Sequence, residues 1–431
     1  MVTTSPRKSS SIISKTPVIG WVICGLAAVF YCYEYLLRMA PGEMAEPIRQ
    51  AFQLDATSFG VVISLYYMIY TPIQVVVGVT CDLYGPRRVL LFAVLMCVVG
   101  SWVFASAHSV EMLSVGRLLI GFGSAFAFVG AMKLAAVWLP ASRSALFAGL
   151  ITALGMAGGM FGGIIIEKIV RNHSWQLNFY MAAGAGILLL IIMAAILRDH
   201  PEAKRQQVNK SVYKQTFVGL GKIFKSRRMW AIGIIGCMLY LSLSVFAELW
   251  GNSFIERAYG FSTSQAASIT SLVFAGWLIG APLMGLISDA LLNRYLSLIV
   301  GSIGTLVVSI CALLISHPSF ALAATLFFLL GLFSSNEVTC FALGREFVSK
   351  ELAGSAAAFV NLVVMVGGLV CQPLIGKLLD YLWSGGIEHG IRTYSGDHFR
   401  LVMLVLPVGA LVAGGLSYML SKTQRKHSIS F

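Results

Sequence analysis

Apolar residues run along this chain in long stretches that short polar segments separate. A helix rises about 1.5 Å per residue, so about 20 apolar residues cross the roughly 30 Å hydrocarbon core of a bilayer. The pattern predicts twelve membrane-spanning helices, near residues 18–40, 57–79, 89–108, 111–137, 145–167, 175–197, 229–251, 267–288, 295–316, 320–343, 353–375 and 398–420. We therefore expect an all-α membrane protein whose polar segments are loops and tails.

Composition agrees with a membrane protein. Of the 431 residues, 58% are hydrophobic and 11% are charged, which excludes a water-soluble protein of this length. The first span follows a Ser-rich polar head, and no small-residue cleavage site follows it, so we interpret it as a retained helix. All eight cysteines fall in spans or on the side of the tails, and no Cys or His cluster has metal-ligand spacing. We expect no disulfide, no metal and no cofactor.

Basic residues are distributed unequally between the two sides of the predicted spans. The side with both tails carries 21 Lys and Arg residues, and the other side carries seven. Cytoplasmic loops are enriched in Lys and Arg, so this bias places both termini in the cytoplasm and suits a bacterial inner membrane. The net charge of +13 follows mainly from this topology. We do not expect nucleic-acid binding, because it needs a basic patch on a folded soluble surface.

The sequence divides into two similar parts. Five segments are expected: a tail at 1–17, an N-terminal six-helix half at 18–197, a basic linker at 198–228, a C-terminal half at 229–420 and a tail at 421–431. An offset of 207 residues aligns three pairs: Gly78 with Gly285, Asp82 with Asp289, and Arg87 with Arg294. This repeat predicts two related halves that frame a substrate site near the bilayer midplane.

The segment between the second and third predicted spans forms a compact motif of Gly78, Asp82, Gly85, Arg87 and Arg88. The glycines allow a tight turn, and an acidic residue followed by two arginines forms a local charge cluster. One such copy is also typical of a turn with basic anchors, but its recurrence in the second half argues for a special role. The motif resembles the signature of the major facilitator superfamily, and the resemblance covers all twelve spans.

The resemblance has further implications. Arg117, with Gly121 and Ala125, is similar to the second motif of the superfamily. The family implies transport by alternating access, a functional monomer and a cytoplasmic gate in which Asp82 and Arg87 form contacts that are made and broken. In the second copy, with Asp289 and Arg294, Leu292 replaces a glycine, and we expect a degenerate gate. Gly159 stands where the antiporter motif has a proline, which weakens but does not remove a drug-efflux assignment.

Charged residues occur inside four of the predicted spans: Glu34 and Arg38 in span one, Arg117 and Lys133 in span four, Glu248 in span seven and Glu337 in span ten. An ionisable side chain costs about 3 kcal/mol or more in the hydrocarbon core, so it usually faces protein or a watered cavity. In the superfamily that this sequence resembles, helices 1, 4, 7 and 10 line the central cavity. These residues therefore predict a charged central site.

Span one offers an anion-binding group. Glu34 and Arg38 lie four residues apart and share a helix face with Tyr31 and Tyr35. Two interpretations stay open: a mutual ion pair without a substrate role, or an Arg38 that binds a substrate anion while Glu34 orients it or carries a proton. We predict that Arg38, Tyr31 and Tyr35 bind substrate.

Span ten offers an acidic group. Glu337 has no basic residue within four positions, so it needs a partner on another helix or a proton, and we assign it to proton coupling or to a substrate ammonium. Asn336 is a further substrate contact. Glu248 is expected nearer the membrane surface, with a weaker claim to proton coupling. The remaining candidates follow: Arg117 for coupling, Tyr66, Tyr67, Tyr70 and Trp277 as walls of the site, and Lys133 either in the cavity or snorkelling to the interface.

These features predict proton-coupled import of a small carboxylate-bearing solute, with protons and the lipid bilayer as the other partners. Opposite charges on the two halves favour a zwitterion, an amino acid or short peptide, whereas an organic acid or a carboxylate siderophore would need only the basic side. A drug or metabolite efflux antiporter and a non-transporting sensor stay open. No P-loop, nucleophile elbow or His-Glu metal motif occurs in the sequence, so we do not expect an enzyme.

Overall fold

The computed structural model describes residues 18–140, 143–198, 219, 221–291, 293–349 and 352–428. The N-terminal tail, most of the basic linker and Leu292 lie outside these residues. Within the described chain, twelve helices are long and apolar enough to cross a membrane, from Val18–Glu43 to Gly396–Thr423. The predicted all-α membrane fold with twelve spans is confirmed.

The first half of the bundle, α1 to α8, supplies six of these spans. Its elements are α1 (Val18–Glu43), α2 (Ala45–Phe52), α3 (Ala56–Tyr84), α4 (Pro86–Ala105), α5 (Val110–Ser124), α6 (Ala127–Trp138), α7 (Ser144–Asn172) and α8 (Trp175–Ile196). The short α2 is amphipathic and lies outside the spans, and α5 and α6 together form one span.

The second half, α10 to α18, supplies the other six spans. Its elements are α10 (Arg227–Leu241), the π-helix η2 (Ser242–Trp250), α11 (Gly251–Tyr259), α12 (Thr263–Ala290), α13 (Arg294–Leu314), α14 (Phe320–Ser334), the 3₁₀ turn η3 (Ser335–Glu337), α15 (Val338–Glu346), α16 (Ala353–Leu382), β1 (Ile387–Glu388), β2 (Ile391–Arg392), α17 (Gly396–Val402) and α18 (Val405–Ser428). The two strands form an antiparallel hairpin that pairs Ile387 with Arg392.

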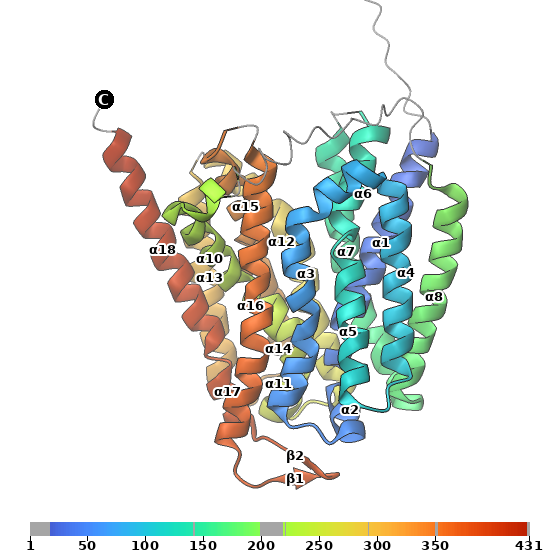
Figure 1. Ribbon diagram of the computed structural model, residues 1–431. Helices are drawn as coiled ribbons and strands as arrows, with labels where there is room; N and C mark the ends of the chain where they lie inside the picture. Colours follow the sequence, from blue (N-terminus) through green and yellow to red (C-terminus); the bar gives the residue numbers. More distant parts are fainter. Residues whose placement is uncertain are drawn as a thin grey trace, which may run out of the picture.

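The helices lie side by side in one bundle with two distinct ends (Figure 1). Helix α1 begins and α18 ends at the same end, which we call the termini face. The β1–β2 hairpin and α2 lie at the opposite end, which we call the hairpin face. These names fix the direction of each span without assuming which side is cytoplasmic.

Equivalent helices of the two halves begin in the same way. Asp55 caps α3, because its side chain accepts a hydrogen bond from the N–H of Ser58. Ser262, which the 207-residue offset aligns with Asp55, caps α12 in a reciprocal capping box with Gln265. Such caps satisfy N–H groups that have no partner inside the helix. The sequence repeat therefore reappears as a repeat of local structure.

Three spans that the sequence pattern presented as continuous are interrupted near their middles. Span four breaks between Ser124 and Ala127, span seven passes through the π-helix η2, and span ten passes through the 3₁₀ turn η3. Irregular backbone at membrane depth is tolerated where protein buries it, and π-helical segments frequently occur at functional sites. All three breaks fall in spans that carry a buried ionisable side chain.

The two halves pack closely from the middle of the bundle to the hairpin face. Helix α3 runs along α16, and α7 runs along α12. At the hairpin end of the first contact, Asp380 of α16 accepts hydrogen bonds from the backbone N–H and the hydroxyl of Thr57. Among the described residues, the hydrogen bonds that join the halves lie at mid-bundle or at the hairpin face. The two halves are therefore held together at this face of the bundle.

Candidate functional site

Arg38 lies at the centre of a buried polar cluster in the middle of the bundle, and 2% of its surface is exposed. Its Nη2 donates to Glu34 Oε1 at 3.2 Å, four residues earlier on α1. Its Nε donates to the hydroxyl of Tyr66 on α3 at 3.0 Å, and its Nη1 donates to the hydroxyl of Tyr240 on α10 at 3.2 Å. The three nitrogen atoms of the guanidinium thus each donate to a different residue, and these residues lie on α1, α3 and α10.

Glu248 of η2 completes the cluster from the second half. Its Oε1 lies 3.9 Å from Arg38 Nη1 and accepts a hydrogen bond from the Tyr240 hydroxyl at 3.4 Å. Its other oxygen accepts a hydrogen bond from the Tyr67 hydroxyl. Glu248 is 1% exposed, and span seven continues to Tyr259, eight residues beyond the expected end at residue 251. Glu248 therefore lies deeper in its span than the expectation placed it.

Tyrosine rings surround the guanidinium of Arg38. Its Cζ atom lies 4.5 Å from the ring centroid of Tyr35, 5.2 Å from that of Tyr66 and 5.1 Å from that of Tyr70. The hydroxyl of Tyr35 is hydrogen-bonded to that of Tyr240 at 3.1 Å. Aromatic faces attract a cation, and the tyrosine hydroxyls can hydrogen-bond to its N–H groups. The tyrosines can therefore hold the positive charge of Arg38 away from water. Polar substituents of an anion bound to Arg38 would contact the same tyrosine hydroxyls.

Side-chain hydrogen bonds to the backbone of span seven hold the π-helix η2, and with it Glu248, in place. The hydroxyl of Ser244 donates to the carbonyl of Tyr240, which competes with the regular helical bonds at that point. The side chain of Gln372 on α16 donates to the carbonyl of Ser244 at 2.7 Å. The backbone of α1 approaches closely at Gly42, where an added Cβ would collide with the carbonyl of Glu248. The cross-half contact therefore depends on a glycine.

Arg117 binds backbone instead of a carboxylate. Its guanidinium donates to the carbonyls of Leu37 at 3.0 Å, Arg38 at 2.9 Å and Ile63 at 3.3 Å. Pro41 lies inside α1 and lacks the N–H that would otherwise bond the Leu37 carbonyl. Arg117 supplies the missing donor, and it fixes α5 against α1 and α3 behind the Arg38 cluster. This geometry explains a buried arginine without a nearby carboxylate partner.

The polar residues of span ten lie in two different environments. Asn336 faces α13, where its amide binds the backbone and hydroxyl of Ser297, and it also accepts from Thr339 at 2.6 Å. Glu337 is 3% exposed and has no hydrogen bond or ion pair with any described residue. Trp277 donates to the hydroxyl of Ser334 at 3.0 Å and packs edge-on against Tyr240, next to the central cluster.

Tyr31 lies at the edge of the cluster. Its ring packs 5.8 Å from that of Tyr35 and 5.5 Å from that of Phe128, and it makes no hydrogen bond with the described residues. Of the predicted substrate contacts, Arg38, Tyr35 and Tyr67 therefore meet in one place, and Trp277 adjoins them.

The repeated motif lies at the termini face and differs between the halves. Asp82 pairs with Lys133 at 2.7 Å, whereas Arg87 donates to the carbonyl of Ala194. Lys133 thus lies at the surface in an ion pair, and the expected contact between Asp82 and Arg87 is absent from the described residues. Gly85 joins α3 to α4 with a φ of 81°, a conformation that favours glycine, and Arg88 is exposed.

The second copy of the motif holds the contact that was expected in the first. Arg294 binds Asp289 at 3.0 Å and also binds Glu346 of α15. Gly78 has open space around it in the first copy, within reach only of the Lys133 side chain. The local pairing is therefore better developed in the copy that the sequence presented as degenerate.

Sequence reasoning missed Tyr240, which contacts three members of the central cluster. One signal was available: Tyr240 precedes Glu248 by eight residues, about two helical turns, so both side chains lie near one face of span seven. A search for hydroxyls two turns from each buried charge would have found it.

A family model described as Major Facilitator Superfamily matches residues 24–371 and again residues 233–430. The chain is 24% identical over 412 residues to the probable sulfoacetate transporter SauU of Cupriavidus necator, covering 91% of this chain and 92% of that protein. It is 23% identical over 438 residues to the probable galactarate/D-glucarate transporter GudP of Escherichia coli, covering 92% and 94% of the two chains.

Among solved structures, the fold is similar to that of a bacterial homologue of the human lysosomal transporter Spinster in an inward-facing, unoccupied conformation. The TM-score is 0.77 with 14% sequence identity, and the match covers 95% of this chain and 98% of that one. At this identity the likeness concerns the fold.

Proposed function

Since the chain belongs to the Major Facilitator Superfamily and is a multi-pass membrane transporter, we propose that it carries a small organic acid by alternating access of its two halves. The observation that carries this proposal is the buried contact of Arg38 with Glu248, which joins the halves at mid-membrane. The substrate site of such a carrier lies between the halves and is open to one side at a time, so contacts between the halves around it form and break during each cycle.

Arg38 is the anchor for the substrate anion. Guanidinium binds a carboxylate or sulfonate through two parallel hydrogen bonds, and such charge-assisted bonds are among the strongest in proteins. In the present conformation Glu34 and Glu248 occupy the edges of Arg38 that an anion would use. An organic acid therefore competes with the carboxylates of the protein for one guanidinium.

This competition provides a route to proton coupling. When a substrate carboxylate replaces Glu248 at Arg38, the displaced side chain lies buried beside Tyr67 and Tyr240 without its positive partner. Uptake of a proton by Glu248 removes that buried charge. Substrate and proton would then travel together, and Glu248 takes the coupling role for which the sequence also offered Glu34 and Glu337.

The similar proteins support an organic acid. The names of SauU and GudP specify sulfoacetate and the dicarboxylic sugar acids galactarate and glucarate, all of them small anions. Glu337 favours a second candidate, an amino acid or short peptide, because a buried carboxyl group without a basic partner could receive a substrate ammonium. The two candidates differ in whether the solute must carry a positive group.

We also propose that the termini face is cytoplasmic. Arg87, Arg88 and Arg294 lie there, in agreement with the enrichment of basic residues on the cytoplasmic side. The closed hairpin face would then be external, so the conformation described here would open inward. Labelling an Arg88→Cys variant with membrane-impermeant maleimide should succeed only in inside-out vesicles.

The transport test uses purified protein in liposomes with sulfoacetate, glucarate, several amino acids and dipeptides. We expect counterflow of an organic acid and its accumulation under an inward proton gradient. Arg38→Ala should abolish both activities, whereas Glu248→Gln should keep exchange and lose accumulation. Arg143→Ala, which removes an exposed arginine at the termini face, is the matched control.

Three outcomes would contradict the proposal. Transport of organic acids by Arg38→Ala at the unaltered rate would remove the anchor. Movement of only zwitterions, with loss in Glu337→Gln, would favour the amino acid or peptide candidate. Binding of a solute without counterflow would favour a sensor.

A further inference from the structure

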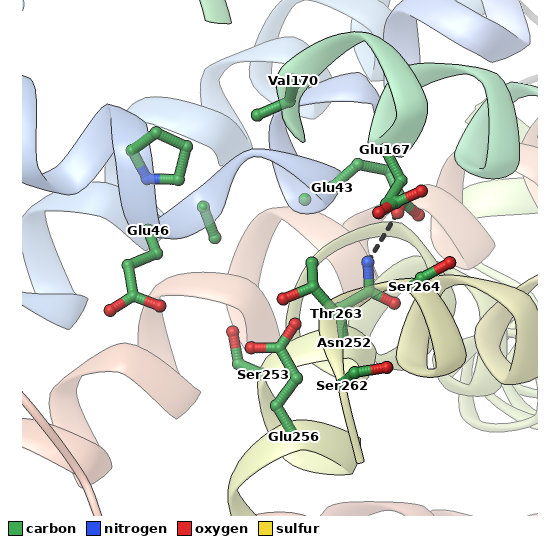
Figure 2. A pocket seen from close by; sticks show the side chains of 13 residues that line it. Glu43, Glu46, Glu167, Val170, Asn252, Ser253, Glu256, Ser262, Thr263 and Ser264 are labelled. Atoms are coloured by element: carbon green, nitrogen blue, oxygen red, sulfur yellow. Dashed lines mark hydrogen bonds between the residues drawn. The ribbon is translucent and has the colours of Figure 1, made fainter. Parts of the chain in front are cut away.

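A second cavity, separate from the Arg38 cluster, lies between the halves at the hairpin face (Figure 2). Its volume is about 460 Å³, which lies within the range of small-molecule sites. Glu43, Glu46 and Glu167 of the first half and Glu256 of the second half line it, and exposed Ser and Thr residues at the start of α12 form its rim. The pocket is thus built by both halves.

The lining of this pocket is acidic, whereas the chain as a whole carries a net positive charge. Four of the 18 acidic residues in a chain of net charge +13 line one cavity, and none of the described residues that line it is basic. Glu43 is within electrostatic range of both Glu167 and Glu256, so negative charges on these groups repel, and Glu46 is in an ion pair with Arg257, which lies outside the lining. A concave acidic surface concentrates cations, and a bound cation would relieve this repulsion.

Asn252 provides an independent sign of a ligand. Its side chain is 6% exposed and lines the pocket, and its Nδ2 donates to Glu43 Oε2 at 2.6 Å. When Glu43 is ionised, that bond fixes the orientation of the amide, because the flipped orientation would place an oxygen against a carboxylate. The Oδ1 atom is then left buried with no hydrogen-bond partner among the described residues. Buried acceptors are nearly always satisfied, so this one lacks a donor that a ligand can supply.

We propose that the pocket binds a small organic cation with primary ammonium groups, such as an alkyl diamine. Each ammonium has three donors, which suit the Asn252 amide oxygen and the surrounding carboxylates. A bare metal ion fits less well, because no group of three or more His, Cys, Asp or Glu side chains in the described chain is arranged to hold one. The pocket also exceeds the size of a single ion.

A bound amine would connect the two halves. Glu43 and Glu167 belong to the first half, and Asn252 and Glu256 belong to the second, so one ligand contacts groups that separate when this face opens. The amine would therefore favour the conformation with a closed hairpin face. This effect depends on the pocket and not on the identity of the transported solute.

The first experiment measures binding to the unaltered, full-length protein in detergent. Isothermal titration calorimetry with 1,4-diaminobutane should give saturable binding, and the diamine should raise the unfolding temperature. 1,4-Butanediol has the same chain without charge and should do neither. Equal effects of the diol and the diamine, or saturable binding of Ca²⁺ but not of the diamine, would overturn the proposal.

The second experiment locates the site. The double variant Glu167→Gln/Glu256→Gln should bind the diamine about tenfold more weakly, because two attractive charges are lost. Asn252→Leu should also weaken binding by removing the buried acceptor. Glu111→Gln removes an exposed carboxylate at the same face but outside the pocket, and it should bind as the unaltered protein does. Undiminished affinity in the double variant, or equal loss in Glu111→Gln, would show that the amine binds elsewhere.

Discussion

The two halves of the bundle share a topology but bury opposite charges. The first half buries two guanidiniums near the central cluster, Arg38 and Arg117, with Glu34, and it also buries Arg49 and Glu167 nearer the hairpin face. Among the described residues of the second half, the buried charged side chains are two carboxylates, Glu248 and Glu337. Each half alone would therefore hold uncompensated charge in the membrane, which is costly.

This difference explains why the central cluster lies at the contact between the halves. Arg38 reaches Tyr240 and Glu248 across the contact, and Tyr67 reaches Glu248 in the opposite direction. The two halves therefore differ around this cluster: the first is mainly cationic and the second is anionic. The comparison predicts that changes to the cationic part disturb substrate binding, whereas changes to the anionic part disturb coupling.

The largest effect is expected for Arg38→Lys. A lysine keeps the charge, but its single nitrogen cannot span Tyr66, Glu34 and Tyr240 as the guanidinium fork does. We expect counterflow to fall about 100-fold, equivalent to about 3 kcal/mol. Counterflow in liposomes tests this, with Arg143→Lys as the control. Activity near the unaltered level would mean that the first half contributes only charge.

The next effect separates the two carboxylates of the second half. Glu248→Gln removes one of the two negative partners of Arg38 and should lower the free energy of unfolding by about 1–3 kcal/mol. Glu337→Gln removes a buried carboxyl group that has no described partner, so stability should stay the same or rise. Thermal unfolding in detergent measures both. A larger loss for Glu337→Gln would show that it has a charged partner in the protein.

A third effect tests the structural role of Arg117. Arg117→Met should destabilise the protein by about 2–3 kcal/mol, because it leaves the Leu37 carbonyl without a donor. Pro41→Ala restores an N–H at the position that normally bonds this carbonyl. The double variant should therefore be more stable than Arg117→Met alone. If Pro41→Ala gives no rescue in a double-mutant cycle, Arg117 acts through its charge instead.

The sequence predicted the spans well because apolar length is a direct physical signal. The second span was expected at 57–79 and is observed at Ala56–Tyr84, with an Asp55 cap at its start. The buried charges on spans one, seven and ten were also found, since each interrupts an apolar run. Arg38 and Tyr35 were assigned to one site from helical spacing alone, and they do meet there.

The contacts between helices could not be predicted in the same way. Asp82 pairs with Lys133, which lies 51 residues away in the sequence, and not with the nearby Arg87. The reason is that α3 packs against α6, which brings Lys133 close to Asp82. The depth of Glu248 was misjudged because the apolar pattern ended span seven at residue 251, whereas the helix continues to Tyr259. Asn336 was grouped with Glu337 because they are adjacent, yet successive helical residues point in different directions.

The smallest effect is expected at the exposed ion pair of the hairpin face, which sharpens the contrast with the buried cluster. Arg257 of the second half binds Glu388 at 2.9 Å and Glu46 of the first half at 3.4 Å. The hydrogen bond from Arg257 lowers the pKa of Glu388 below its ordinary value of 4.5. A carboxylate with a lowered pKa in the folded state stabilises the protein above its unfolded pKa, and this contribution disappears as the pH falls through the folded value.

The Arg257–Glu388 ion pair should therefore contribute a small, constant amount to the free energy of unfolding from about pH 5 to 8. This contribution should be lost only below about pH 4.5. Thermal unfolding of Glu388→Gln should differ slightly from that of the unaltered protein at neutral pH, and the difference should shrink in acid and in high salt. Water solvates the partly exposed Arg257 when Glu388 is removed, whereas the buried Arg38 has no such replacement when Glu248 is removed. A loss in Glu388→Gln as large as that in Glu248→Gln would mean that burial does not distinguish the exposed ion pair from the buried one.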